Sequence, residues 1–443
     1  MDTRLFGTDG IRGVANADLT PEFVLRVGRA AAAVLAPGGS RFLIARDTRL
    51  SGPMLEAALT AALTAAGASV LRAGILPTPG AAYLTRQAGA TAGVVISASH
   101  NPIEDNGLKF FNGDGFKLPD AAEDAIEAAM GDGIPAAAGH PAGVEDIPDA
   151  VEQYVEFVAS LAAASLAGLR VVVDCAYGAA WRAAPKLWRH LGATVIPLND
   201  EPDGGRINVA CGSTHPDVVS QAVLEHAADV GFAHDGDADR VIAVDDTGRV
   251  IDGDAMMAVC ALHLAAQGRL AGRRVVATVM SNFGLEAALQ RAGIALERTA
   301  VGDRYVLERM RELDASVGGE QSGHLIFLDH STTGDGLITA VQVTNVMMET
   351  GRRLSELASV VERFPQVLRN VPIPDGARFG VDPAVQTAVD AAARALGDRG
   401  RVLVRSSGTE PLVRVMVEAH DAATADRLAA GLVEVVQRSL ARH

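Results

Sequence analysis

Residues 41–47 read Arg-Phe-Leu-Ile-Ala-Arg-Asp, and this apolar run after a basic residue opens a pattern that decides the fold. An alanine-rich stretch follows it, and a Gly-Ala turn at 67–68 opens a second apolar run. The same order recurs over residues 170–195 and 273–294. Strands that alternate with helices in this way predict β-α-β units with mainly parallel strands. Three widely spaced copies indicate three related α/β domains, and chance likeness among Val- and Ala-rich segments is the alternative.

Two stretches rich in Gly and Pro divide the chain. Residues 131–148 are expected to link the first domain to the second. Residues 364–376 are expected to open a different last unit, with helices over 383–396 and 422–440 and two strands around a polar loop. We place the remaining boundary at 251–254. The predicted fold is three related α/β domains with mixed, mostly parallel sheets plus a C-terminal α+β domain, arranged around a central cleft. The predicted domains span residues 1–150, 151–252, 253–368 and 369–443.

The composition limits the classes of protein that the chain can be. With 49% hydrophobic and only 4% aromatic residues among 443, the cores are expected to consist of Ala, Val and Leu. The net charge of −15 argues against binding to nucleic acid or to anionic membranes. No apolar run approaches the roughly 20 residues that a membrane span requires. Three cysteines and the absence of an apolar leader after Met1 predict a cytoplasmic protein without disulfides.

The first segment with recognisable chemistry follows the β-branched run at 94–96, which predicts a buried strand. It ends in Ser-Ala-Ser-His-Asn-Pro at 97–102, where Asn-Pro turns the chain. A hydroxyl at the mouth of a strand is well placed to act as a nucleophile or phosphate carrier. Residues 105–107 should turn the chain back and bring Lys109, one of only three lysines, to the same place. The alternative is an ordinary corner whose serines satisfy backbone groups.

Residues 235–240, Asp-Gly-Asp-Ala-Asp-Arg, place three carboxylates at alternating positions between two strand-like runs. Such carboxylates repel one another unless a hard cation such as Mg²⁺ binds through their oxygens. A calcium loop of the EF-hand type is excluded, because it needs Gly where Arg240 stands, Glu where Asp246 stands, and helices on both sides. A solvated acidic turn is the remaining alternative.

Residues 405–411, Arg-Ser-Ser-Gly-Thr-Glu-Pro, form a short polar loop between two strand-like runs. Consecutive backbone N–H groups in such a loop can hold an anion, and Arg405 and Arg414 can add bidentate contacts to phosphate. The alternative is a plain hairpin turn, because Ser-Gly-Thr is ordinary turn chemistry.

Residues 318–324, Gly-Gly-Glu-Gln-Ser-Gly-His, form another polar loop bounded by glycines. Glu320 and Ser322 could bind sugar hydroxyls or receive a substrate ammonium, whereas the role of His324 is open. Near the N-terminus, Arg12 stands between glycines, which suits close approach to a ligand and equally a tight turn. The candidate loops fall in different predicted domains, so we expect them to converge on a phosphorylated polyol.

At these segments the chain resembles the α-D-phosphohexomutase family. The matching motifs are Phe-Gly-Thr-Asp-Gly-Ile-Arg-Gly at 6–13, Ser-Ala-Ser-His-Asn-Pro at 97–102, Asp-Gly-Asp-Ala-Asp-Arg at 235–240, Gly-Glu-Gln-Ser-Gly-His at 319–324 and Arg-Ser-Ser-Gly-Thr-Glu-Pro at 405–411. They span the whole chain in order. The first motif and Gln321 favour the member of the family that acts on glucosamine phosphates over the phosphomannomutase/phosphoglucomutase members.

The resemblance implies a role for each motif. Ser99 would be a phosphoserine whose phosphate holds Mg²⁺ together with Asp235, Asp237 and Asp239. The catalytic residues would be Ser99, Lys109, Arg12 and His100. Lys109 is our candidate general base, a role that requires a lowered pKa. The residues that bind substrate would be Arg240, Glu320, Ser322, His324, Arg405, Ser406, Ser407, Gly408, Thr409 and Arg414.

The implied reaction converts glucosamine 6-phosphate into glucosamine 1-phosphate through a 1,6-bisphosphate, for the synthesis of UDP-N-acetylglucosamine. The alternatives are a phosphomannomutase/phosphoglucomutase of the same family, a Mg²⁺-dependent sugar phosphatase with an aspartyl nucleophile, and a sugar-phosphate binder without activity. The resemblance also implies a homodimer.

Overall fold

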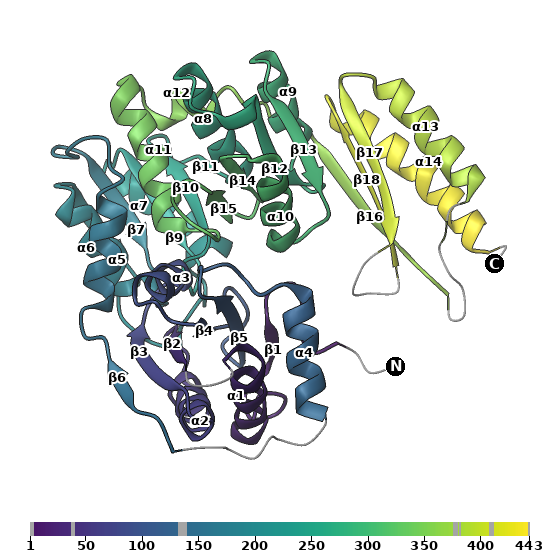
Figure 1. Cartoon of the computed structure of the whole chain (residues 1–443). Coiled ribbons are helices and arrows are strands. Elements are labelled where there is room, and N and C mark those ends of the chain that lie inside the picture. The colour runs from purple at the N-terminus through teal and green to yellow at the C-terminus, as the bar shows by residue number, and fades with distance from the viewer. Residues whose placement is uncertain are drawn as a thin grey trace. The chain divides into compact units, whose positions relative to one another are not determined.

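The computed structural model describes residues 4–36, 40–131, 140–374, 380, 382–406 and 412–441. The chain forms two compact units (Figure 1). The first unit comprises Met1–Met280 and Ile294–Val360, and the second comprises Ser281–Gly293 and Val361–His443. Among the described helices, none combines the length and the hydropathy needed to cross a lipid bilayer.

The first sheet has six strands in the order β1-β5-β4-β2-β3-β6. Its parallel pairs are β2 with β3, β2 with β4 and β3 with β6, whereas β5 runs antiparallel to β1 and β4. The strands are β1 (Ile11–Val14), β2 (Arg41–Arg46), β3 (Ser69–Ile75), β4 (Ala92–Ile96), β5 (Asp105–Asn112) and β6 (Val144–Asp146). The helices are α1 (Pro21–Leu35), α2 (Gly52–Ala65), α3 (Thr78–Gln87) and α4 (Asp120–Gly131).

The second sheet has the order β11-β10-β9-β7-β8, with β7 parallel to β8 and β9. Its strands are β7 (Arg170–Asp174), β8 (Thr194–Leu198), β9 (Val230–His234), β10 (Val241–Asp245) and β11 (Val250–Ile251). The accompanying helices are α5 (Ala150–Ala159), α6 (Ala180–His190) and α7 (Asp217–Glu225), with a short 3₁₀ helix at Gly212–Thr214.

The third sheet has the order β13-β12-β14-β15, with β12 parallel to β13 and β14. Its strands are β12 (Arg274–Thr278), β13 (Ala295–Thr299), β14 (Val317–Gly319) and β15 (Leu325–Phe327). The helices along this part of the chain are α8 (Gly253–Ala266), α9 (Phe283–Arg291), α10 (Asp303–Leu313), α11 (Gly336–Thr350) and α12 (Leu354–Ala358), with a 3₁₀ helix at Ala271–Arg273. Several helices begin where a short polar side chain accepts a backbone N–H, as Asp252 does for α8 and Asp335 for α11.

The repeated pattern in the sequence corresponds to three β-α-β units. They are β2-α2-β3, β7-α6-β8 and β12-α9-β13, and in each unit the two strands pair in parallel. The third β-α-β unit differs from the other two, because its helix α9 belongs to the second of the two compact units of the chain. The prediction of α/β domains with mixed, mostly parallel sheets is therefore confirmed.

The second unit contains an antiparallel sheet in the order β16-β18-β17. Its elements are β16 (Gln366–Pro372), α13 (Pro383–Leu396), β17 (Gly400–Ser406), β18 (Leu412–Ala419) and α14 (Ala422–Leu440). Figure 1 shows α13 and α14 side by side against this sheet, and their apolar residues share one core with it. The predicted α+β unit is confirmed, with one strand, β16, that the sequence analysis placed in a linker.

Two other local predictions are wrong. The stretch 131–148 is not only a linker, because β6 pairs in parallel with β3 inside it. Residues 105–107 do not turn the chain, because they already belong to β5 and pair with β1. The turn lies earlier, where the Asn101 N–H donates to Ala98 O at 3.1 Å and the Asp105 N–H to Pro102 O at 3.2 Å.

Candidate active site

Ser99 lies in the loop that follows β4, and its side chain points at the acidic loop. The residue is buried and has a left-handed backbone, with φ of 55°. Such a conformation costs about 1–3 kcal/mol for a residue other than glycine, so the surrounding structure must hold it in place. The Ser99 hydroxyl donates to Asp235 Oδ2 at 2.6 Å and lies 3.2 Å from His100 Nδ1. Ser99 is thus in contact with His100, which is predicted to be catalytic, and with Asp235, which is a predicted metal ligand.

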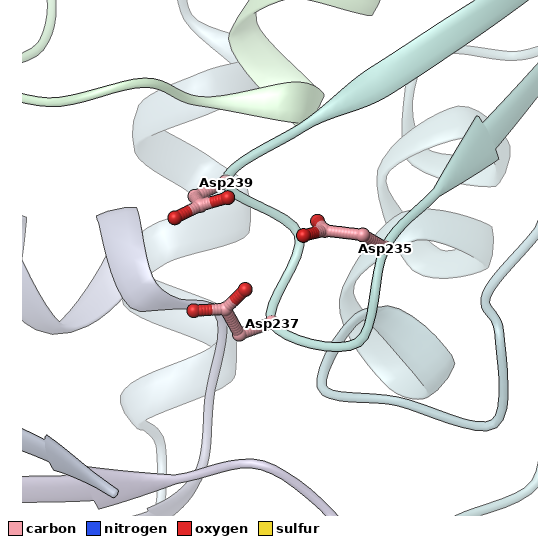
Figure 2. A group of neighbouring side chains, drawn as sticks. All are labelled: Asp235, Asp237 and Asp239. Atoms are coloured by element: carbon pink, nitrogen blue, oxygen red, sulfur yellow. The ribbon is translucent and has the colours of Figure 1, made fainter. Parts of the chain in front are cut away.

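The three aspartates occupy the loop between β9 and β10, and their carboxylates turn toward a common space (Figure 2). All three are buried, and one oxygen of each lies within 4.8 Å of the others. The loop folds on itself, since the Arg240 N–H donates to Asp235 Oδ1 at 3.1 Å. None of the described residues donates a hydrogen bond to the buried Asp237 Oδ1. A buried anionic oxygen without a donor is costly, so this donor set fits a hard divalent cation.

The loop of Ser99 and the acidic loop approach each other at Gly236. A Cβ atom at Gly236 would lie 2.5 Å from the carbonyl oxygen of Ser99 and 2.9 Å from Asn208 Nδ2. Asn208 Nδ2 itself donates to Ser99 O at 2.9 Å. Only glycine allows this close approach of two backbones without displacement.

Lys109 reaches the same place from β5. Its Nζ lies 2.7 Å from Asp237 Oδ2, 3.0 Å from Asp239 Oδ2 and 2.9 Å from Asp9 Oδ2. Burial alone would lower the pKa of Lys109, but the three carboxylates outweigh it and raise the pKa well above its usual value. The lowered pKa that a general base requires is therefore not found, and Lys109 lies in the site as an ammonium.

The surroundings of Asp235 and Asp239 shift the pKa values of these two carboxylates in opposite directions. Burial raises the pKa of Asp235, and the charges of Asp239 and Asp237 raise it further. Burial also acts to raise the pKa of Asp239, but Lys109 and His324 outweigh it and hold that pKa well below its usual value. Asp239 is thus more firmly ionised than Asp235.

A chain of ion pairs that the sequence analysis missed extends from this centre. Lys117 is partly buried and pairs with both Asp9 and Asp303. His324 then joins Asp303 to Asp239, with Nε2 at 3.4 Å from Asp303 Oδ2 and Nδ1 at 3.6 Å from Asp239 Oδ1. The only sign of these ion pairs in the sequence is the rarity of lysine, which marks Lys117 as well as Lys109.

A cavity of about 420 Å³ adjoins the acidic loop. Its wall contains Arg12, Asp239, Arg240, Glu320 and His324, which come from three of the predicted motifs. In this wall, the Gly302 N–H donates to Glu320 Oε1 at 3.2 Å. Glu320 Oε2 also accepts the Ser322 hydroxyl at 3.4 Å. Cations, carboxylates and hydroxyls in one cavity of this size suit a phosphorylated sugar.

Arg12 lines the cavity, and His100 contacts Ser99. Arg12 pairs with Asp9 and donates to Asn101 Oδ1 at 3.0 Å. Burial lowers the pKa of His100 to about 4, and the nearby charges of Arg240 and Arg12 act in the same direction. His100 is therefore neutral near pH 7, and its Nδ1 either donates to or accepts from the Ser99 hydroxyl according to the tautomer.

In the second unit, Arg405 and Arg414 lie directly opposite each other on β17 and β18. Burial lowers the pKa of Arg405, and the charge of Arg414 lowers it further. Two guanidinium groups on neighbouring strands can bind a phosphate through several N–H donors. Ser406 ends β17, and the predicted Ser407, Gly408 and Thr409 lie outside the described residues.

Four domain descriptions of one family match the chain in order: Phosphoglucomutase/phosphomannomutase α/β/α domain I at 3–134, domain II at 152–248, domain III at 252–364 and the C-terminal domain at 368–435. The chain is 54% identical to a protein named phosphoglucosamine mutase from Moorella thermoacetica, over 98% of this chain and 99% of that protein. It is 53% identical to a protein of the same name from Desulforudis audaxviator, over 98% and 97%.

Among solved structures, the chain resembles a phosphoglucomutase/phosphomannomutase family protein from Burkholderia thailandensis. The TM-score is 0.81 and the identity 25%, over 99% of this chain and 98% of that one. Together with the domain matches, this likeness confirms the resemblance seen in the motifs. The chain therefore belongs to the phosphoglucomutase/phosphomannomutase family.

Proposed function

We propose that this protein is a phosphoglucosamine mutase, an isomerase that interconverts glucosamine 6-phosphate and glucosamine 1-phosphate for the synthesis of UDP-N-acetylglucosamine. The observation that carries the proposal is the contact of 2.6 Å between the Ser99 hydroxyl and a carboxylate of the aspartate triad. This contact places a phosphoryl carrier at a cation site next to a polar cavity. The names of the relatives that are more than half identical support glucosamine phosphate as the substrate.

Asp235, Asp237 and Asp239, with a phosphate on Ser99, would hold Mg²⁺. When bound, the ion would offset charge on the phosphoryl group in transfer. The unpartnered Asp237 Oδ1 supports this assignment. The cationic groups of Lys109, Arg12 and Arg240 would stabilise the same charge. Positioning by fixed charges, without a protein base at Lys109, accounts for most of the catalysis that such a transfer needs.

The reaction consists of two transfers in opposite directions. In the first, the bond between phosphorus and Ser99 Oγ breaks and a bond to O1 of glucosamine 6-phosphate forms, while the proton of the 1-hydroxyl passes to the released Ser99 Oγ. The resulting 1,6-bisphosphate then turns over, and Ser99 takes back the phosphoryl group from O6. Glu320 and Ser322 would bind the sugar in both orientations, with His324 beside them. The phosphate that does not react would be held by Arg405, Arg414 and the loop that contains Ser406, Ser407, Gly408 and Thr409.

The test is to incubate the purified protein with a hexose 1,6-bisphosphate and Mg²⁺ and to map phosphate by mass spectrometry. We expect one phosphate in the peptide that contains Ser99, and conversion of glucosamine 6-phosphate to the 1-phosphate by NMR. Ser99→Ala should abolish both while it leaves the circular dichroism spectrum unchanged. Near-normal turnover by Ser99→Ala, or phosphate on an aspartate with net release of phosphate, would reject the mutase and favour a phosphatase.

The same assay separates the two members of the family that the sequence leaves open. We expect kcat/KM for glucosamine phosphates to exceed that for glucose and mannose phosphates. The opposite order would make the protein a phosphomannomutase/phosphoglucomutase. Binding of all these sugars without any product would leave only a sugar-phosphate binder.

The wider expectations belong to the same proposal. The partner would be a small phosphorylated amino sugar, with neither nucleic acid nor membrane involved, and the place of action would be the cytoplasm. The homodimer and the four domain boundaries stay predictions. Light scattering at several concentrations checks the former, because a monomeric mass throughout would reject it.

A further inference from the structure

A buried arginine that no motif pointed to lies under the loop of Ser99. Arg49 follows β2, and its side chain is fully buried. Its Nη2 donates to Ser99 O at 2.9 Å and to Asn101 O at 2.8 Å. Its Nη1 donates to Asp105 O at 2.8 Å and also to Pro102 O. Four carbonyl oxygens of one short loop therefore converge on a single guanidinium group.

The fifth donor of Arg49 completes the arrangement. Its Nε lies 3.0 Å from Asp47 Oδ2, so all five N–H groups of the guanidinium have partners. Asp47 Oδ2 also accepts the Ser97 hydroxyl at 2.6 Å, and Ser97 Oγ accepts the N–H of Ser99 at 2.9 Å. The two peptide groups that flank Ser99 are thus both tied to one buried ion pair.

We propose that Arg49, through Asp47 and Ser97, is the positioning residue that sets the direction of the Ser99 side chain. Ser99 has an unfavourable left-handed backbone, and a loop free to relax would leave it. The guanidinium holds Ser99 O on one side, and Ser97 holds the Ser99 N–H on the other. Fixing both ends of the residue fixes the direction of Cβ and so keeps Oγ at the aspartate triad.

The residue type matters because the geometry is that of a planar group with several donors. A lysine has three donors on one nitrogen and cannot reach four carbonyl oxygens and a carboxylate at once. Arg49 is tied to backbone atoms and to Asp47, and it does not line the cavity, so its loss should change transfer and not binding of the sugar. A misplacement of about 1 Å can lower a transfer rate about 10²-fold.

The test compares Arg49→Lys with the unchanged protein in the mutase assay, and the inference therefore rests on the proposed function. We expect kcat to fall about 10²-fold, with KM for glucosamine 6-phosphate changed less than about threefold. Phosphorylation of Ser99 by a hexose 1,6-bisphosphate should slow by a similar factor. Amide hydrogen exchange in the peptide 97–106 should speed up. The control is Arg72→Lys, which alters a surface pair between Arg72 and Asp146 in the same sheet and should change none of these rates.

A second variant keeps the inference testable if Arg49→Lys does not fold. Ser97→Ala removes the bond to the N–H of Ser99 together with the bond from the Ser97 hydroxyl to Asp47, and we expect kcat to fall about tenfold with KM unchanged. The double variant should lose less than the product of the two factors, because both changes act on one loop. The inference is overturned if the folded variants keep the normal kcat and phosphorylation rate, or if kcat and KM change together. Failure of the proposed function looks different, because then the unchanged protein itself takes up no phosphate on Ser99.

Discussion

The loop of Ser99 and the acidic loop meet at the same site, yet they are supported by different kinds of group. A charged guanidinium, that of Arg49, gathers the carbonyl oxygens of the Ser99 loop. In the acidic loop, the carbonyl oxygens instead accept neutral N–H groups, from Gly336 to Ala238 O at 3.0 Å and from Ala179 to Gly236 O at 2.8 Å. These neutral N–H groups bind carbonyl oxygens of the acidic loop and leave its carboxylate oxygens to other partners. The backbone of the Ser99 loop is thus held by a charged group, and the backbone of the acidic loop by neutral groups.

The acidic loop also depends on a group that can titrate. Gly336 is the first residue of α11, and the preceding Asp335 caps this helix by accepting the N–H of Ile338 at 2.9 Å. The Tyr154 hydroxyl lies 2.8 Å from both carboxylate oxygens of Asp335. The support of the acidic loop should therefore respond to pH.

The largest expected effect comes from removing one charge of the acidic loop. In Asp237→Asn, an amide replaces a carboxylate that has a free oxygen and pairs with Lys109. We expect kcat/KM to fall about 10³-fold and the Mg²⁺ concentration for half-maximal rate to rise. The measurement is the steady-state rate at several Mg²⁺ concentrations. Asp246→Asn is the matched control, because this carboxylate pairs with Arg353 at 3.2 Å and adjoins no predicted ligand. Equal rates for both variants would contradict the role of the triad.

The second prediction compares the carboxylates at the ends of β2 and β7. Asp47→Asn leaves Arg49 buried without its counter-charge and should cost about 3–5 kcal/mol. Asp174→Asn replaces an acceptor of backbone bonds from Ala176 and Gly212 and should cost only about 1–3 kcal/mol. Denaturant unfolding of both variants checks the order. A larger loss of unfolding free energy in Asp174→Asn than in Asp47→Asn would contradict the contrast between charged and neutral support.

The third prediction tests the contact between the two loops. In Gly236→Ala, the new methyl group would lie 2.5 Å from Ser99 O, which must move. We expect a loss of about 1–3 kcal/mol in stability and a lower kcat, because the shift reaches Ser99. Gly143→Ala serves as the control, since a Cβ there meets no atom within 4 Å. Unchanged activity in a folded Gly236→Ala variant would show that the loops are not tightly coupled.

The smallest expected effect is one of pH. Burial raises the pKa of Asp335 to about 7, so the folded chain holds this proton more tightly than the unfolded chain. Its contribution to stability is complete below about pH 4 and is lost as the pH rises through about 7. Between pH 5.5 and 8, the Tm of the unchanged protein should therefore fall by a few degrees more than that of Asp335→Asn. Parallel changes in Tm, measured by calorimetry, would contradict this prediction.

The sequence predicted the parts of the fold and the site that depend on local patterns. The β-α-β units were visible because apolar runs alternate with alanine-rich helices, and the acidic loop because three aspartates repeat at short spacing. The strand β16 was missed because it begins and ends next to proline and holds only one fully buried residue, Val371. Such a strand is recognisable only once β18 lies beside it.

The missed parts of the site depend on contacts between distant residues. Arg49 is one arginine among many in the sequence, and its partners at 99–105 become apparent only when β2 and β4 are paired. Lys117 and Asp303 are far apart in the chain, so no spacing connects them. The left-handed backbone of Ser99 was hidden as well, because Asn-Pro predicts a turn without specifying which residue takes the unusual angle.

The positive φ of Ser99 has a consequence for the choice of amino acid at this position. Threonine bears an equivalent hydroxyl group, but its second γ substituent branches at the carbon that already crowds the peptide in a left-handed residue. We therefore expect Ser99→Thr to strain this loop before any question of reactivity arises. Asparagine and aspartate tolerate that backbone far better, so an aspartate there would be the natural permanently charged mimic of the phosphorylated form.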